Sequence, residues 1–399
     1  MASRSFLILI LAGGLISLIA MGSRAAFGLF LEPVSSEFGW GREVFGLALA
    51  IQNIVWGLSQ PFASAIADKY GSGRTLVVSG LVYAAGLFLM SQTGSPGELH
   101  LTAGVMIGLG LSGTGFGVVI GSVGRAVPDD KRSMALGIVG ASGSLGQFLM
   151  VPLGQAFLAG YGWSMALVLI GFCALLMIPA SALVTGKAED SAAAGAASLS
   201  SAVREAAGNG SYWLLFFGFF VCGFHVTFVA VHLPAYIVDQ NVDAKYGAIA
   251  LSVVGLFNVI GSLAAGYLGG KYSKKYLLST LYFLRAAVFV AFIIVPISPL
   301  TILIFAGTLG LLWLSTVPLT SGLVAVMFGP KYMTTLFGFV FFGHQIGAFL
   351  GAWIGGVAFD LYGSYDIVWW MSVALGILSG IIHWPIRENV PVSRAAAAG

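Results

Sequence analysis

Long apolar runs alternate with short polar segments along the entire chain of 399 residues. A helix of about 20 residues is long enough to cross the ~30 Å hydrocarbon core of a membrane. The runs show no two-residue alternation, so they do not fit the strands of a membrane barrel. The pattern predicts an all-α integral membrane protein with twelve transmembrane helices, at about 6–31, 44–66, 75–94, 99–123, 134–158, 164–186, 211–238, 246–268, 276–296, 300–327, 333–359 and 364–386.

An offset of 201 residues aligns the second half of the chain with the first half. At this offset the run around Gly146 aligns with the run around Gly347, and the first run aligns with the seventh. A parallel repeat of this kind is typical of transporters built from two pseudo-symmetric bundles. We therefore predict a six-helix bundle over 1–186, a cytoplasmic linker over 187–210 and a second six-helix bundle over 211–399.

Composition and charge support the membrane assignment. Hydrophobic residues make up 58% of the chain and charged residues 8%, whereas soluble domains have about 25% charged residues. Placing the N-terminus in the cytoplasm assigns fourteen of the 18 basic residues to cytoplasmic segments and only Arg42 and Lys245 to external ones, as the positive-inside rule requires. We expect a multi-pass protein of the cell (inner) membrane with both termini cytoplasmic. The net charge of +3 does not indicate nucleic-acid binding.

Two arginines, Arg24 and Arg285, lie within apolar runs, and no acidic residue lies deep in one. A charge near the bilayer centre costs roughly 2.5–3.5 kcal/mol or more, so it normally faces protein or a water-filled cavity. Our first interpretation of Arg24 is a substrate anchor, because its guanidinium can hold a carboxylate. The alternative is a structural arginine bonded to backbone carbonyls or to Glu32. Arg285 is a candidate second charge.

Three of the five histidines lie well inside apolar runs. His225 and His232 are seven residues apart in one predicted helix and therefore share a face, and the repeat places His225 where the first half has Arg24. Buried imidazoles can change charge near neutral pH, so both are candidate proton carriers, with His225 also a substrate ligand. His344 in the eleventh run is another candidate ligand. Ordinary hydrogen bonding in the core is the alternative for each histidine.

Other polar side chains interrupt runs that otherwise contain apolar residues. Asn53 in the second run and Gln147 in the fifth are candidate substrate ligands, and bonding between helices is the alternative. No carboxylate or thiolate accompanies the histidines at metal-ligand spacing, so we expect no metal and no cofactor. The chain also has no P-loop, nucleophile elbow or zincin pattern, and we do not expect an enzyme.

The segment "ADKYGSGR" at 67–74, between the second and third runs, resembles the signature of the major facilitator superfamily. Asp68, Lys69 and Arg74 match the acidic and basic residues of that signature. The equivalent segment of the second half, "GGKYSKK", keeps basic residues but has no acid. The resemblance implies a fold of twelve helices in two bundles. It also implies that the three matching residues act in gating, because a carboxylate near a helix end can latch one state.

The segment "SRAAFGLFLEP" at 23–33, followed by "FGW", resembles the monocarboxylate transporter family and its bacterial members. That family has a basic residue at this point of its first helix, and Arg24 matches it. The family's second basic substrate-binding residue is an arginine on helix eight, with an aspartate four residues earlier. Here the corresponding segment has Asn258 and Ser262, which we take as substrate-binding candidates. Arg285, on the ninth helix, is not equivalent by position.

Together these features predict a secondary transporter that moves a small organic anion, similar to a monocarboxylate, by alternating access. Proton coupling is a further expectation. The predicted partners are the substrate anion, the lipid bilayer and protons. One alternative is efflux of a neutral or amphipathic compound, in which Arg24 would be structural. Another is a transporter-like membrane receptor, although the linker and tails are too short for a soluble signalling domain.

Overall fold

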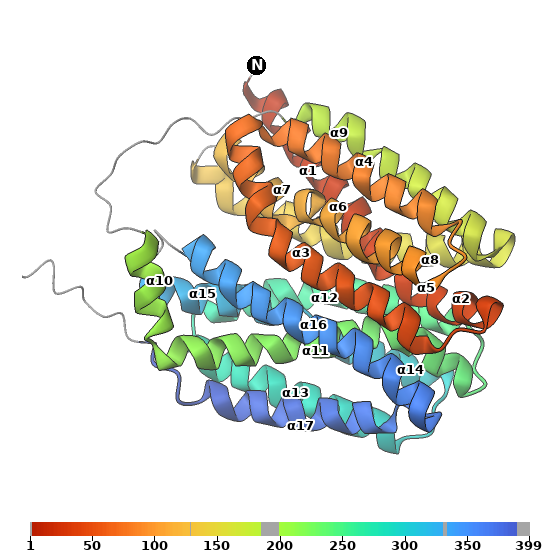
Figure 1. The fold of residues 1–399 in the computed structure, drawn as a ribbon. Helices are drawn as coiled ribbons and strands as arrows, with labels where there is room; N and C mark the ends of the chain where they lie inside the picture. Colours follow the sequence, from red (N-terminus) through yellow and green to blue (C-terminus); the bar gives the residue numbers. More distant parts are fainter. Residues whose placement is uncertain (1, 128, 185–198, 330–332, 389–399) are drawn as a thin grey trace, which may run out of the picture.

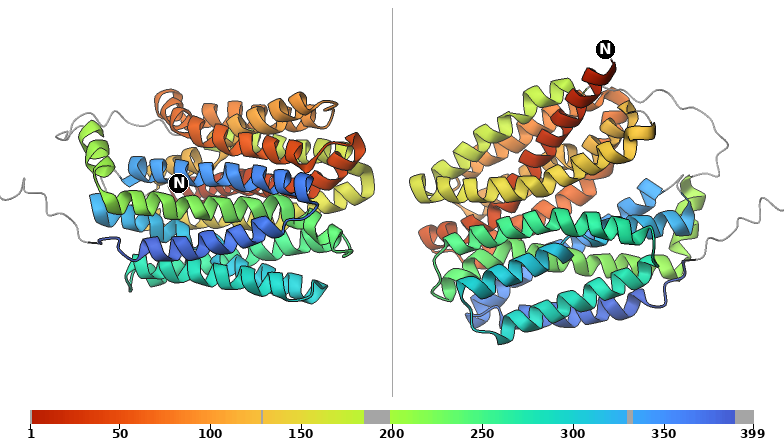
Figure 2. Two further views of the ribbon diagram at one scale, coloured as in Figure 1. Left: turned by 60° about the horizontal axis from the view of Figure 1, so that its bottom comes forward. Right: turned by 180° about the vertical axis from the view of Figure 1, so that it is seen from behind.

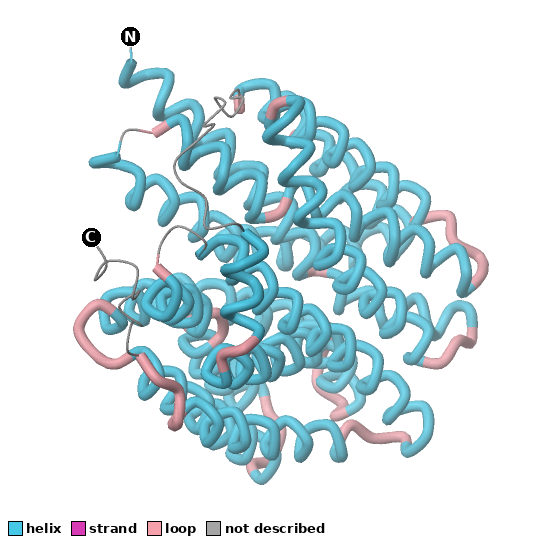
Figure 3. The backbone as a smooth tube through the Cα atoms, turned by 60° about the vertical axis from the view of Figure 1, so that its left-hand side comes forward, coloured by secondary structure: helices cyan, strands magenta, loops and turns pink. Residues whose placement is uncertain are grey.

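The computed structural model describes residues 2–127, 129–184, 199–329 and 333–388. This part of the chain is helical and contains no strand (Figure 3). The elements of its first half are α1 (Ala2–Ala25), η1 (Phe27–Phe30), α2 (Leu31–Phe38), α3 (Arg42–Tyr70), α4 (Ser72–Met90), α5 (Pro96–Leu99), η2 (His100–Met106), α6 (Ile107–Thr114), α7 (Phe116–Ala126), α8 (Asp129–Leu175) and α9 (Met177–Leu183).

The second half begins with α10 (Leu199–Ala207), which lies at one end of the molecule (Figure 1). The remaining helices are α11 (Gly210–Asp239), α12 (Lys245–Gly269), α13 (Lys274–Ile294), α14 (Pro299–Leu312), α15 (Thr316–Phe328), α16 (Met333–Tyr362) and α17 (Asp366–His383).

The predicted all-α membrane fold is confirmed. Within the described residues, ten segments are long and apolar enough to cross a membrane. One of them, Met134–Leu183, contains a reversal at Gly162, whose φ of 77° and ψ of 170° are not helical. Helix α3 is a further helix of 29 residues in the same bundle. The helices therefore cover all twelve runs that the sequence predicts, although several runs are divided between two or more elements.

The helices form two groups that lie side by side (Figures 1 and 2). Helices α1–α9, which we call the first group, pack mainly on one another, with α1 against α8. Helices α11–α17, the second group, show the matching arrangement, with α11 against α16. The groups contact each other chiefly through α3 with α16 and through α8 with α12. The boundaries 1–186, 187–210 and 211–399 stay predictions, and residues 187–198 lie outside the described part.

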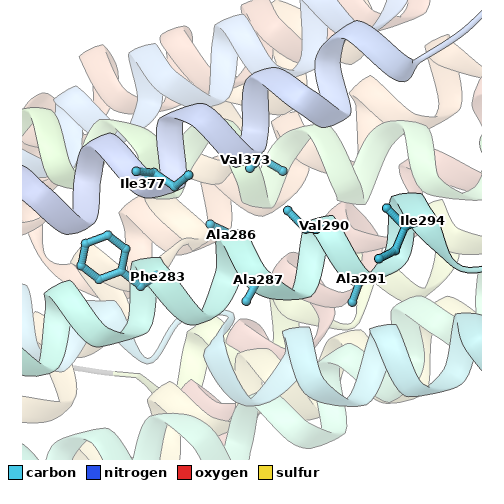
Figure 4. Close-up of a pocket in the computed structure, with 8 residues that line it drawn as sticks. All are labelled: Phe283, Ala286, Ala287, Val290, Ala291, Ile294, Val373 and Ile377. Carbon is cyan, nitrogen blue, oxygen red and sulfur yellow. The ribbon is translucent and has the colours of Figure 1, made fainter.

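The outer faces of the helices are apolar. Large hydrophobic side chains are exposed along them, among them Phe62, Ile294 and Leu361. Figure 4 shows a shallow pocket between α13 and α17 that is lined only by hydrophobic side chains, from Phe283 to Ile377. Such surfaces are unfavourable in water but suit the hydrocarbon of a bilayer. The fold therefore presents its apolar residues to lipid and keeps its polar residues between helices.

Glycines allow the paired helices of each group to approach closely. A Cβ atom on Gly146 of α8 would lie 2.0 Å from the carbonyl oxygen of Leu18 in α1. In the second group a Cβ on Gly347 of α16 would lie 1.9 Å from the carbonyl oxygen of Phe220 in α11. Both distances are far shorter than van der Waals contact. Small residues at these crossings let the backbones pack directly, as in other membrane helix pairs. Gly146 and Gly347 are also a matched pair in the sequence repeat.

Gly146→Ala should therefore destabilise the protein, because α1 and α8 must separate to admit the added methyl group. We expect a loss of about 1–3 kcal/mol, the usual cost of overpacking, seen as a lower midpoint of thermal unfolding in detergent. Gly140→Ala, on the same helix, is the matched control, because nothing lies within 4 Å of a Cβ at that position. Equal midpoints for the two variants would contradict the close-packing account.

Candidate binding site between the two helix groups

Arg24 lies in the last turn of α1, immediately before the chain tightens into the 3₁₀ turn of η1. Its Nη2 donates a 2.6 Å hydrogen bond to Oδ1 of Asn53 in α3, and its Cζ lies 5.2 Å from the centre of the Trp56 ring. Its Nε is buried and has no hydrogen-bond partner. The side chain is only partly buried. Among the described residues no carboxylate pairs with it, so Arg24 is a cation with neutral neighbours.

The neighbours of Arg24 connect it to the second group. The backbone carbonyl of Asn53 accepts a 3.1 Å hydrogen bond from Nε2 of Gln345 in α16. Oε1 of Gln345 is 3.0 Å from Nδ1 of His344. On the apolar side the Trp56 ring meets the edge of Phe341 at 5.5 Å, and Phe341 stacks on His344 at 5.7 Å. Arg24 and His344 are thus joined through a short set of contacts that crosses the interface.

Gln147, Asn258 and Ser262 lie on the other contact between the groups, where α8 meets α12. Nε2 of Gln147 donates to the Leu251 carbonyl at 2.9 Å, and Nδ2 of Asn258 donates to Oγ of Ser144 at 2.8 Å. Ser262 donates to Oδ1 of Asn258 at 3.2 Å. Gln147 and Asn258 thus link the two groups in this conformation, whereas Ser262 bonds within α12. Their role as substrate ligands stays a prediction.

The structure does not bring His225 to Arg24. The ring of His225 is buried between α11, α13 and α17, with Nε2 2.8 Å from the Ser372 carbonyl oxygen and its ring 4.9 Å from that of Phe289. The repeat aligns the two positions, but an imidazole is shorter than an arginine side chain and stays within its own group. The roles of His225 as a substrate ligand and as a proton carrier stay predictions.

His232 does share the helix face of His225, but it belongs to a different set of contacts. Its Nε2 lies 2.7 Å from the Ala352 carbonyl oxygen and its Nδ1 lies 3.3 Å from Oη of Tyr365. Both ring nitrogens are therefore used within the second group. No contact of the structure connects His232 to Arg24, and a role for it in proton coupling stays a prediction.

Arg285 is buried, with only 1% of its surface exposed, and it does not point to Arg24. Its Nε and Nη2 donate to the Leu312 carbonyl at 3.1 and 2.6 Å, and Nη2 also donates to the Trp313 carbonyl. These carbonyls lie where α14 ends, before α15 begins at Thr316. The guanidinium thus satisfies the backbone acceptors of a helix break. The interpretation of Arg285 as a possible second substrate charge stays a prediction.

Asp68, Lys69 and Arg74 lie at the turn between α3 and α4, which Gly71 forms with a φ of 99°. All three side chains are exposed, and Nζ of Lys69 lies 5.1 Å from the Tyr70 ring. Their gating role stays a prediction.

The two groups meet at one end of the interface and separate toward the other. Contacts of α3 with the second group run from Arg42 to Gly57. In Figure 1, α3 and α16 converge at the start of α3 and diverge toward the end where α10 lies. We call the α10 end, where the two helices diverge, the open end, and the opposite end, where the contacts of α3 with the second group lie, the closed end.

Sequence reasoning did not identify the residues that hold the closed end. Arg42 donates to both carboxylate oxygens of Asp239 at 2.6 and 2.7 Å, and to Oη of Tyr365 at 2.9 Å. Asp360 accepts from the backbone N–H groups of Arg42 and Glu43, each at 2.8 Å, and so caps the start of α3. We call these five residues the closed-end cluster. One signal was available: Arg42 is one of only two basic residues assigned to the external side.

These features define a polytopic membrane transport protein, with two related helix groups and a partly exposed cation near their contact. The profile of the Major Facilitator Superfamily matches residues 13–352, and the chain belongs to this superfamily. The resemblance inferred from segment 67–74 is thereby confirmed.

Curated relatives agree with this assignment. The chain is 25% identical over 383 residues to "Uncharacterized MFS-type transporter YcxA" of Bacillus subtilis, covering 92% of this chain and 91% of that protein. It is 25% identical over 363 residues to Monocarboxylate transporter 13 of Bos taurus, covering 88% and 82%. A similar fold occurs in a bacterial homolog of the human lysosomal transporter Spinster, in an inward-facing and occupied conformation, with a TM-score of 0.77, 14% identity and 96% of each chain covered.

The closed-end cluster predicts that Arg42→Gln will favour opening at that end, because a bidentate ion pair and the bond to Tyr365 are lost. The reporter is a cysteine introduced by Ala230→Cys, at the contact between α11 and η1, and the measurement is its rate of labelling by a water-soluble maleimide. We expect labelling to accelerate by several-fold. Arg204→Gln, on exposed α10, is the control. Unchanged labelling in the Arg42 variant would show that the cluster does not hold this end closed.

Proposed function

We propose that this protein is a secondary transporter that moves a small organic anion by alternating access between its two helix groups. The observation that carries the proposal is Arg24, a cation within the membrane span whose near partners are the neutral Asn53 and the Trp56 ring. A membrane-embedded charge is costly unless something compensates it. A substrate carboxylate would supply the missing negative charge and would accept from the planar guanidinium.

The contacts around Arg24 also suggest how binding is linked to movement. Asn53 bonds to Arg24 through its side chain and to Gln345 of the second group through its backbone. An anion that competes with Asn53 for Arg24 would therefore disturb a contact between the groups. Asn53 and His344 are accordingly proposed as ligands with Arg24, and Gln147, Asn258 and Ser262 as residues that reorganise when α8 and α12 move apart.

The name of the relative Monocarboxylate transporter 13 favours a monocarboxylate as the substrate. The aromatic rings of Trp56 and Phe341 provide apolar surface next to the charge, which suits the short hydrocarbon part of such an acid. We further propose that the open end faces the cytoplasm of a cell (inner) membrane. The excess of basic residues in the segments at that end supports this orientation.

Arg24→Ala and Arg24→Gln should weaken carboxylate binding by at least about tenfold, because charge-assisted hydrogen bonds contribute about 1.5–3 kcal/mol. Arg24→Lys should retain part of the affinity, since a point charge remains. The measurements are calorimetric binding in detergent and uptake of labelled lactate, pyruvate and larger acids into proteoliposomes. Unchanged affinity in Arg24→Ala would refute the anchor role. If that variant also binds neutral amphipathic compounds, efflux of such compounds becomes the better function.

The exposed turn between α3 and α4 should affect the rate of conformational change without contacting the ligand. Asp68→Asn is therefore expected to slow transport in proteoliposomes severalfold while leaving the detergent-state affinity within a few-fold of the unmodified protein. Ser59→Ala, in the same helix and outside the turn, serves as the control. Complete loss of binding in Asp68→Asn would contradict a gating role and indicate a structural one.

A further inference from the structure

Arg285 has no acidic partner among the described residues, although it is one of the most deeply buried side chains. Its hydrogen bonds go to two backbone carbonyls at the end of α14, and its Nη1 is buried with no partner. The end of a helix offers only a partial negative charge. A buried guanidinium with no full counter-charge is costly in a medium of low dielectric constant. The position therefore calls for a negative group close to Arg285.

The thiol of Cys222 in α11 occupies such a position. The thiol donates to the Trp313 carbonyl oxygen at 3.9 Å, the same oxygen that accepts from Arg285, and its Sγ lies 3.2 Å from Oγ1 of Thr316. The side chain is fully buried. Cysteine and tyrosine are the side chains at this location that can ionise to an anion, and a thiol ordinarily does so at a lower pH than tyrosine. Cys222 can therefore provide a whole negative charge beside Arg285 by losing its proton.

Apart from the Trp313 carbonyl, which accepts from the thiol, the groups that face Cys222 can donate hydrogen bonds or carry positive charge. Arg285 and Tyr282 face it from α13, and Oη of Tyr282 is buried with no partner. His344 faces it from α16. The two helices cross closely here, because a Cβ atom on Gly223 would lie 1.8 Å from the His344 carbonyl oxygen. Thr316 is the neighbour from α15, and His383 of α17 stacks behind Tyr282 at 5.1 Å. No carboxylate of the described residues contacts Cys222.

We propose that Cys222 is a proton-binding group of this protein, with its thiolate as the counter-ion of Arg285. One proton converts the thiolate to a thiol, which removes one negative charge and leaves Arg285 uncompensated. No other bond is made or broken. The chain has no acid deep in a membrane span, so the thiol takes the place that an embedded carboxylate would have.

His344 connects this pair to the proposed substrate site. It neighbours Cys222 on one side and reaches Asn53, the partner of Arg24, through Gln345 on the other. Protonation of Cys222 adds net positive charge at the second-group end of this set of contacts and so favours binding of an anion at Arg24, and by linkage a bound anion favours protonation. This coupling rests on the proposed function, whereas the ion pair between Cys222 and Arg285 does not.

The first experiment detects the thiolate by its ultraviolet absorbance in purified protein. In the Cys173→Ser variant the remaining cysteine is Cys222, and the spectrum of the double variant with Cys222→Ser is subtracted. We expect a thiolate band that disappears reversibly on acidification. Arg285→Lys should keep the band and Arg285→Met should lose it. A band absent at every pH overturns the proposal, as does one that does not respond to pH.

The second experiment tests coupling in proteoliposomes. Cys222→Ser should lose substrate accumulation driven by a pH gradient but keep counterflow exchange, whereas the Cys173→Ser control should keep both. Cys222→Asp should restore part of the accumulation, because it supplies another proton-binding anion. Wild-type accumulation in Cys222→Ser overturns the coupling role. If no carboxylate is transported by any variant, the proposed function fails, and the absorbance titration still decides whether Cys222 binds the proton.

Discussion

Burial of positive charge in a medium without water is the constraint on which this structure depends. Every polar group between the helices must find its partner within the protein, and Arg24 and Arg285 meet this requirement differently. Arg285 is enclosed and bonded to the carbonyls of a helix break. Arg24 is partly exposed and has a neutral amide as its hydrogen-bond partner. The two arginines therefore differ both in exposure and in the kind of group that they bond to.

Polar contacts cross the interface between the helix groups at several points, and these contacts differ in strength. At the closed end Arg42 joins Asp239 in a bidentate ion pair, and Asp360 caps the start of α3. Near Arg24 the two groups are joined by a hydrogen bond that the side-chain amide of Gln345 donates to the Asn53 backbone carbonyl. Neutral hydrogen bonds exchange more readily than a charged, bidentate pair. The hydrogen bond near Arg24 is therefore easier to exchange than the ion pair at the closed end.

The two halves of the chain share the way their helices cross, but the side chains at matching positions have different contacts. Gly146 and Gly347 make the same close crossing in each group. Arg24 and His225, also paired by the repeat, have unrelated surroundings, since the histidine is enclosed by Phe289 and the Ser372 carbonyl. Backbone packing tolerates few residue types at a close crossing, whereas a side chain that points away from it is free to diverge. An internal repeat is thus a better guide to helix arrangement than to function.

The sequence by itself determined the membrane class, the run of helices, the superfamily and the unusual position of Arg24, because apolar periodicity and an isolated charge are properties of local sequence. Only the tertiary structure decided which polar groups meet: Arg24 with Asn53, Arg285 with the α14 carbonyls, and Arg42 with Asp239, a residue 197 positions away. It also placed His225 away from Arg24. Such contacts depend on how helices rotate and cross, and this is set by packing between distant segments, which residue spacing along one helix does not specify.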